Sequence, residues 1–306
     1  VSMVFAVSMR ATEKVNIPLI SSVTSLGLNT FLNYSLIYGN LGFPALGVSG
    51  AAIATLISRI LEIVVIVTIV YYNNMAVACK LRDIRNITLK FVISIFKISI
   101  PVLMNESLWV LGTSVFTVVY GRMGTNEIAS FNIVQTLDRI AFVSVLGLGN
   151  ACAVMVGKQI GAGFPERAYI YAARSNLIAP VAGILIALLT FFARYPVLSL
   201  YDVPLQVKQY ASMMILVSAF SMPVRALNFT NLMGVMRAGG DAHYVLALEA
   251  IPLWMVAVPL TIIGGLVFGF AVPVVYLLAF SEEMIKCILG IRRFLTKKWI
   301  RNLSEN

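Results

Sequence analysis

The chain has 306 residues, of which 59% are hydrophobic and 12% are charged, and its mean hydropathy is +0.91. Soluble domains contain about 45–50% apolar and about 25% charged residues, so this composition excludes an ordinary soluble enzyme, a disordered chain and a nucleic-acid-binding domain. The net charge of +10 comes from Lys and Arg residues in short polar gaps between apolar runs, which indicates membrane topology rather than an anionic partner. We therefore expect an all-α polytopic membrane protein.

Long apolar runs follow one another along the chain, and about 20 residues suffice for a helix to cross the hydrocarbon core of a bilayer. The uncharged stretch 15–58 is too long for one span, and Gly, Asn and Pro residues at 39–44 predict a turn within it. The sequence thus predicts about eight transmembrane helices, near 15–38, 46–72, 91–121, 125–157, 171–193, 206–236, 243–266 and 270–291.

Basic residues alternate from side to side of these spans. Only Arg122, Arg194 and Lys208 lie in one set of gaps, whereas fifteen Lys and Arg residues lie in the other set. Because cytoplasmic loops are enriched in Lys and Arg, we expect the second set and the C-terminus to be cytoplasmic. The fifteen residues are Arg10, Lys14, Lys80, Arg82, Arg85, Lys90, Lys158, Arg167, Arg174, Arg237, Arg292, Arg293, Lys297, Lys298 and Arg301.

A short internal repeat suggests how the spans are organised. The segment 9–11, Met-Arg-Ala, recurs at 236–238, and each copy precedes two spans joined by a short outer turn. On this comparison 91–306 is a six-helix bundle with a basic tail, 1–78 holds the last two helices of a preceding bundle, and 79–90 is a cytoplasmic loop between them. Roughly 130 residues of the first bundle would then precede Val1. Such parallel repeats are typical of secondary transporters whose site lies between the halves.

Several motifs along the chain resemble one membrane-protein family. They are the segments 9–14 and 42–55, Asn29, Asn33-Tyr34, Ile100-Pro101, Asn105-Glu106, Trp109, 157–163, Asn228, 236–241, Trp254 and Pro259. In this order they resemble the fifth to eighth, tenth and eleventh helices of multidrug and toxic compound extrusion (MATE) transporters, bacterial branch. The resemblance covers nearly the whole chain. It implies a cation-coupled efflux antiporter of twelve helices in two six-helix bundles, with the first helices absent from this sequence.

Glu106 is a candidate cation-binding residue in the third span. A charge at the bilayer centre is unfavourable by at least about 2.5–3.5 kcal/mol and usually faces the protein interior. With no basic residue within one turn in sequence, this carboxylate could hold a proton or a cation, or it could pair with a base on another helix. The resemblance supports the first reading, because bacterial members carry a cation-binding Glu on the equivalent helix. Glu106 lies nearly one turn earlier than that residue, counted from Pro101.

Two further pairs of charges lie within predicted spans. Asp138 and Arg139 are adjacent, so they point in different directions on a helix, and we expect one or both to face a cavity or a neighbouring helix. Arg59 and Glu62 are three residues apart, which predicts an intramembrane ion pair. The alternative for Arg59 and Glu62 is a network that changes partners between inward-facing and outward-facing states.

The sixth predicted span carries Arg225 just after Pro223, a residue that tends to kink a helix. Asn228 lies one turn further on the same face, so we expect both polar residues to line a transport pathway. The resemblance places a second acidic residue of bacterial members near this point, where the chain has Arg225. Their sodium site therefore does not carry over whole.

The last two predicted spans contain additional charges. Glu249 lies near one end of the seventh span and is either cavity-facing or interfacial. Glu282, Glu283 and Lys286 lie close enough to a helix end that we expect them, like Lys97, to reach the membrane interface.

The chain offers no constellation for enzymatic chemistry. Cys79, Cys152 and Cys287 are far apart, and His243 has no acidic and nucleophilic partners at a recognisable spacing. We therefore expect neither an enzyme nor a cofactor or metal site.

The sequence predicts a monomeric secondary antiporter of the bacterial inner membrane. It would export amphipathic, often cationic drugs in exchange for Na⁺ or H⁺, since apolar walls with few carboxylates select for such compounds. The main alternative is a lipid-linked oligosaccharide flippase of the same superfamily, for which Arg59, Arg139 and Arg225 would supply cavity-facing positive charge. A third possibility is a membrane receptor or assembly subunit without transport activity.

Overall fold

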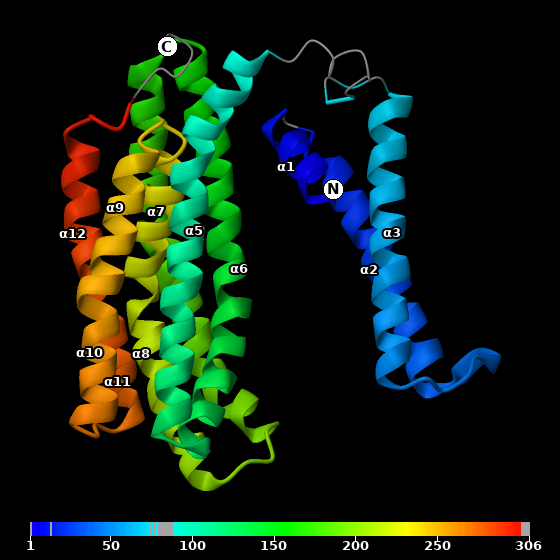
Figure 1. The fold of residues 1–306 in the computed structure, drawn as a ribbon, viewed down its shortest axis with the longest axis vertical. Coiled ribbons are helices and arrows are strands. Elements are labelled where there is room, and N and C mark those ends of the chain that lie inside the picture. Colours follow the sequence, from blue (N-terminus) through cyan, green and yellow to red (C-terminus); the bar gives the residue numbers. More distant parts are fainter. Residues whose placement is uncertain (1, 13, 74, 76, 79–87, 301–306) are drawn as a thin grey trace. The chain divides into compact units, whose positions relative to one another are not determined.

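The structure is a computed structural model that describes residues 2–12, 14–73, 75, 77, 78 and 88–300. Contacts divide the chain into two compact units, Val1–Val92 and Ile93–Asn306, and each is considered by itself (Figure 1). Most of the loop predicted at 79–90, with Lys80, Arg82 and Arg85, and the tail residue Arg301 lie outside the described residues.

The described part of the N-terminal unit is made of helices joined by short turns. It contains α1 (Ser2–Ala11), α2 (Asn16–Tyr38), the short 3₁₀ turn η1 (Asn40–Gly42) and α3 (Val48–Tyr72). The α2 helix ends at Gly39, whose φ of 72° is the left-handed conformation that glycine adopts without strain. The turn predicted at 39–44 is therefore present.

Helices α2 and α3 pack closely through small residues. The hydroxyls of Ser21 and Ser25 donate to the backbone carbonyls of Glu62 and Ser58, at 2.9 and 2.8 Å. A Cβ atom at Gly50 would lie 2.5 Å from the Leu36 carbonyl oxygen, so only glycine allows this approach. Small residues at helix contacts are typical of membrane proteins.

The C-terminal unit is a bundle of long helices (Figure 1). They form because a backbone in lipid must satisfy its own hydrogen bonds. The helices are α5 (Leu89–Met123), α6 (Thr125–Gly161), α7 (Pro165–Ser199), α8 (Leu205–Phe229) with its π-helical extension η2 (Thr230–Met236), α9 (Ala242–Pro252), η3 (Leu253–Ala257), α10 (Val258–Ile262), η4 (Ile263–Val267), α11 (Val272–Ala279) and α12 (Ser281–Leu295).

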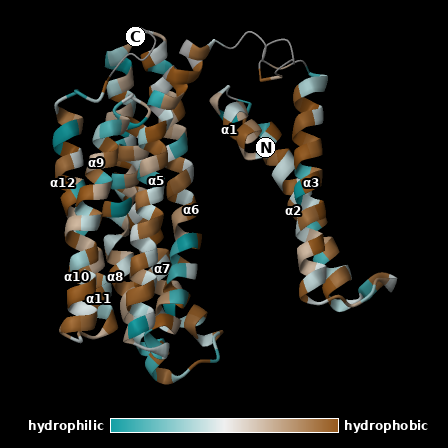
Figure 2. Cartoon of the chain, in the orientation of Figure 1, coloured by the Kyte–Doolittle hydropathy of each residue, from teal (hydrophilic) through white to brown (hydrophobic). Residues whose placement is uncertain are grey.

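Among the described residues, six helices are long and apolar enough to cross a membrane: Val48–Tyr72, Ile95–Met123, Thr125–Gly161, Pro165–Ser199, Leu205–Met236 and Ala242–Val267. Figure 2 shows hydrophobic residues along most of each helix, interrupted by hydrophilic ones. The predicted first span is present as α2, a helix of 23 residues. The predicted last span is divided at Phe280 into α11 and α12.

The basic gaps of the C-terminal unit meet at one end of the bundle. Lys297 Nζ lies 3.2 Å from Glu166 at the start of α7, and Arg293 donates to Asp241 before α9 at 2.7 Å. A Cβ at Gly239 would lie 2.5 Å from the Trp299 ring, so the 237–241 gap and the end of the chain are in close contact. The alternation of basic gaps in sequence thus corresponds to one end of the folded bundle.

Candidate functional site: charged residues inside the bundle

Asp138 of α6 pairs with Arg225 of α8. The guanidinium nitrogen Nη1 lies 3.1 Å from Asp138 Oδ2, and the two side chains are only 14% and 18% exposed. The Ser218 hydroxyl donates to the other carboxylate oxygen, and the Tyr276 hydroxyl of α11 donates to Oδ2 at 3.1 Å. Three helices therefore meet at one carboxylate, which accepts every one of these donors.

Aromatic rings enclose the positive partner of this pair. The Arg225 guanidinium carbon lies 5.2 Å from the ring centre of Phe142 and 5.2 Å from that of Phe280. Such cation–π contacts are stronger when the cation is shielded from water. Arg225 is therefore held by a carboxylate and two rings.

The charged face of α12 points into the bundle. Glu282 and Lys286 are 8% and 4% exposed, and Lys286 Nζ lies 3.0 Å from Glu282 Oε2. The apolar residues Met284 and Ile288 of the same helix are exposed instead. The expectation that Glu282 and Lys286 reach the membrane interface is wrong, because the four-residue spacing places both on the inner face of α12.

Glu283 connects α12 to α8. The Asn228 amide donates to the Glu283 carboxylate at 2.7 Å and to its backbone carbonyl at 2.8 Å. Asn228 is 5% exposed, and its partners are two acceptors, so its amide group must face them. Glu283 also interacts electrostatically with both Arg225 and Lys286, and it thus links the Asp138–Arg225 pair to the charges of α12.

Glu249 of α9 lies next to α5. The buried Asn105 amide donates to its carboxylate. Lys286, Arg237 and Glu106 all interact electrostatically with Glu249. Of the two sequence-based readings, cavity-facing or interfacial, the structure gives Glu249 a position among the inner charges of the bundle.

Glu106 follows Asn105 in α5 and pairs with Arg237. The guanidinium nitrogen Nη1 is 3.0 Å from Glu106 Oε1, and the side chains are 54% and 24% exposed, respectively. Arg237 belongs to the Met-Arg-Ala repeat, which the sequence places in a gap outside the membrane. In this conformation Glu106 thus has a basic partner, as its alternative reading expects, although Arg237 caps η2 rather than lying within a helix.

Other predicted residues lie apart from this group. Arg139 is exposed, whereas the adjacent Asp138 points inward, as their different directions on a helix require. Arg59 and Glu62 belong to α3 in the N-terminal unit, where Arg59 Nη1 lies 2.6 Å from Glu62 Oε2. Glu62 is buried, whereas the Arg59 side chain is 69% exposed.

Eight charged residues of the C-terminal unit form a group that we call the charged network. Acidic groups outnumber basic ones in it. Each member has a hydrogen bond, an ion pair or an electrostatic interaction with another, so the network runs through α5, α6, α8, α9 and α12. Five carboxylates and three bases leave two negative charges when all are ionised. The members are Glu106, Asp138, Glu249, Glu282, Glu283, Arg225, Arg237 and Lys286.

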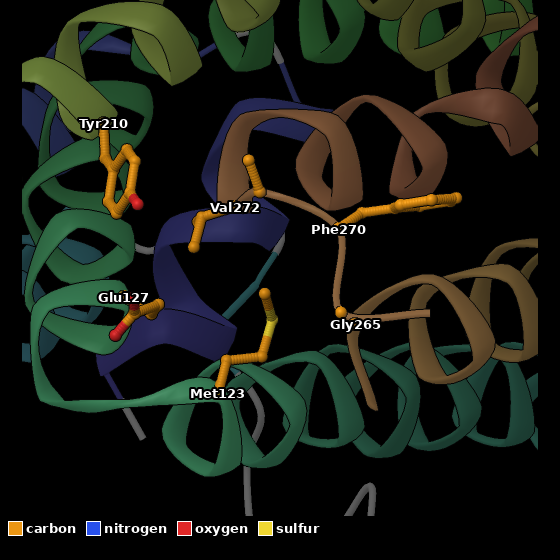
Figure 3. A pocket seen from close by; sticks show the side chains of 8 residues that line it. Met123, Glu127, Tyr210, Gly265, Phe270 and Val272 are labelled. Atoms are coloured by element: carbon orange, nitrogen blue, oxygen red, sulfur yellow. The ribbon is translucent and has the colours of Figure 1, made fainter. Parts of the chain in front are cut away.

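A separate cavity of about 190 Å³ lies at the end of the bundle opposite the basic gaps. Figure 3 shows Glu127 and Tyr210 on one side of this cavity, with Met123 below them. Phe270, Gly265, Gly269, Ala271 and Val272 complete its lining. Among the described residues, no three His, Cys, Asp or Glu side chains are grouped so that they could hold a metal ion.

Comparison with known proteins decides the family. Residues 101–263, more than half of the chain, match the family named MatE. The chain belongs to the MatE family. It is thus a multi-pass membrane protein, and its charged network lies in the bundle that carries the family match.

Curated relatives agree along most of the chain. The uncharacterized transporter YisQ of Bacillus subtilis (strain 168) is 24% identical over 275 residues, which cover 90% of this chain and 60% of YisQ. The probable multidrug resistance protein NorM of Pasteurella multocida (strain Pm70) is 27% identical over 246 residues, which cover 77% of this chain and 51% of that protein. The chain therefore spans little more than half the length of these relatives.

Solved MATE structures share the fold. The Vibrio cholerae MATE transporter VcmN superposes with a TM-score of 0.82 at 19% identity and covers 97% of this chain and 66% of its own. A eukaryotic MATE transporter gives a TM-score of 0.80 at 20% identity, over 97% of this chain and 65% of its own. The predicted fold class, an all-α membrane protein of the MATE type, is confirmed.

Proposed function

We propose that the full-length protein is a secondary antiporter that exports amphipathic, often cationic small molecules in exchange for Na⁺ or H⁺. The observation that carries this proposal is the excess of carboxylates in the charged network. A buried charge is unfavourable in lipid unless it is paired. A network with two surplus negative charges therefore favours the uptake of an ion, and exchange of that ion for a cationic drug would drive export.

The relatives support the same proposal. Several are named probable multidrug resistance proteins, and two of them match 82% and 77% of this chain. The protein would operate as a monomer in the bacterial inner membrane, with its basic end and C-terminus in the cytoplasm. Each positive charge that moves inward would contribute about 2.3 kcal/mol per 100 mV of membrane potential.

The flippase alternative is less well supported. It requires basic side chains that are free to bind a pyrophosphate. Two of the three candidates, Arg59 and Arg225, are instead paired with carboxylates at 2.6 and 3.1 Å. The third candidate, Arg139, is exposed and has no carboxylate within 4.0 Å among the described residues.

The experiment is an efflux assay in bacteria that lack their own drug exporters. Cells that express the full-length protein should accumulate less ethidium than cells with an empty vector, and Glu106→Gln should raise accumulation. Equal accumulation in the first two strains, with the protein present in the membrane, would contradict the proposal. Defects in cell-wall precursors on deletion, without any change in ethidium, would favour the flippase.

A further inference from the structure

We propose that the ion bound by this bundle is the proton and that it binds to Glu249. This residue belongs to a group of four charged side chains that we call the Lys286 cluster: Glu249, Glu282, Glu283 and Lys286. The proposal rests on the antiport function proposed above and specifies its ion and its residue. It follows from charge, from the direction of the hydrogen bonds and from burial.

The surplus negative charge of the network is concentrated in the Lys286 cluster. Asp138 and Glu106 each have their own ion-pair partner, Arg225 and Arg237, at 3.1 and 3.0 Å. Three carboxylates, in contrast, interact with the single ammonium group of Lys286. One proton on a carboxylate of the cluster would remove half of the surplus without any rearrangement of the helices.

Among the three carboxylates, Glu249 and Glu283 have no base within 4.0 Å in the described part of the chain, and each accepts a hydrogen bond from one neutral amide. Glu282 lies 3.0 Å from Lys286 Nζ, and the Glu283 carboxylate accepts from Asn228 at 2.7 Å. No base lies within 4.0 Å of Glu249 among the described residues, and its hydrogen-bond donor is the neutral Asn105 amide. Glu249 differs from Glu283 in its neighbour, because the buried Oδ1 atom of Asn105 has no hydrogen-bond partner among the described residues, whereas that of Asn228 is not left in this state.

Asn105 can serve Glu249 in both protonation states. The residue is 3% exposed, and its Nδ2 donates to the carboxylate. Its Oδ1 atom is buried and has no hydrogen-bond partner in the described part of the chain. A buried acceptor without a partner is unfavourable. A protonated Glu249 would donate its O–H to this oxygen while its other oxygen still accepts from Nδ2, so the acid and its neighbour would both be satisfied.

The same geometry disfavours a metal cation. Hard cations take several oxygen ligands. Here Asn105 and Asn228 present N–H groups, not oxygens, to the carboxylates, and Lys286 already occupies the cluster with a tethered positive charge. Na⁺ at Glu249 would have to displace the Asn105 N–H group and approach an ammonium group, whereas a proton adds to an oxygen atom directly.

Infrared difference spectroscopy of the purified chain in lipid nanodiscs tests this proposal. A band from a protonated carboxylic acid should be present at neutral pH and should disappear as the pH rises. Glu249→Gln should abolish it, whereas Glu166→Gln, at a surface carboxylate whose side chain is 78% exposed, should leave it unchanged. Replacing K⁺ with Na⁺ should not shift the midpoint of the transition.

Two further variants keep the test decisive if Glu249→Gln does not fold. Asn105→Ala should shift the frequency of the band, because it removes the hydrogen-bond partner. Lys286→Gln should make the band persist to higher pH, because it removes a nearby positive charge. A band that is unaffected by all three variants, or one that Na⁺ removes at constant pH, would overturn the proposal.

The spectroscopic result is independent of transport. An efflux assay driven only by Na⁺, together with the absence of the band, would refute the proton site and leave the antiport function standing. The presence of the band in a full-length protein that exports nothing would support the proton site and refute the antiport function.

Discussion

The Arg225 guanidinium and the Asp138 carboxylate, 3.1 Å apart, join α8 to α6 in the interior of the bundle. Removing one partner of a buried pair leaves the other charge uncompensated, which is unfavourable by about 3–5 kcal/mol. We expect Arg225→Gln to lower the stability of the protein in detergent by an amount of this order, as measured by thermal unfolding.

A double variant tests whether the two charges stabilise the protein together or independently. Asp138→Asn with Arg225→Gln should be less destabilised than the sum of the single variants, because neither charge is then left alone. Additive effects would show that the two charges do not compensate each other in the folded protein.

A second prediction concerns the contact between α7 and α8. A Cβ at Gly183 would lie 2.6 Å from Pro223 Cα, whereas one at Gly147 of α6 would meet no atom within 4 Å. Gly183→Ala should therefore destabilise the bundle by about 1–3 kcal/mol through overpacking. Gly147→Ala should be neutral or stabilising by about 0.5–1 kcal/mol, because alanine favours the helix. Equal effects of both substitutions on thermal unfolding would refute the close approach.

The sequence predicts the helices well and their charged contacts poorly. Apolar runs locate α5 to α9 because a membrane helix needs about 20 apolar residues. The partner of Asp138 lies 87 residues away on α8, and nothing in local sequence identifies it. The sequence predicts only that Asp138, Arg139 or both face a cavity or a neighbouring helix.

Hydropathy is misleading for α12. The helix carries Glu282, Glu283 and Lys286, which are expected at the membrane interface because they lie near the end of an apolar run. Glu282 and Lys286 instead turn into the bundle, where they pair with each other, and the apolar side chains of Met284 and Ile288 turn outward. A four-residue spacing of Glu282, Lys286 and Gly290 is the signal that could have shown this.

Two ion pairs at the basic end of the bundle should contribute very differently. Asp241 is 1% exposed and receives hydrogen bonds from Arg293 at 2.7 Å, whereas the Lys297 and Glu166 side chains are 45% and 78% exposed. Arg293→Gln should destabilise the protein by about 3–5 kcal/mol. Lys297→Gln should change stability by less than about 1 kcal/mol. Thermal unfolding of the two variants compares them directly, and a larger loss for Lys297→Gln would contradict the burial pattern.

The Glu106–Arg237 pair allows a charge-swap test. Glu106→Gln should lower both stability and efflux, because it removes a partner of Arg237 and a carboxylate of the charged network. Exchanging the two residues, Glu106→Arg with Arg237→Glu, should restore part of the stability because the ion pair can form again. Efflux should not return, since the carboxylate is then in a different position. Recovery of efflux by the swap would make the pair purely structural.

We propose that the surplus carboxylates of this bundle bind the ion that is exchanged for the drug. The most direct measurement uses the full-length protein in liposomes and records tetraphenylphosphonium movement and internal pH together. We predict that tetraphenylphosphonium moves against its gradient when protons flow the other way, and that Glu249→Gln abolishes both movements while the protein still folds. Tetraphenylphosphonium movement that continues unchanged in Glu249→Gln, or that never couples to protons or Na⁺, would contradict this mechanism.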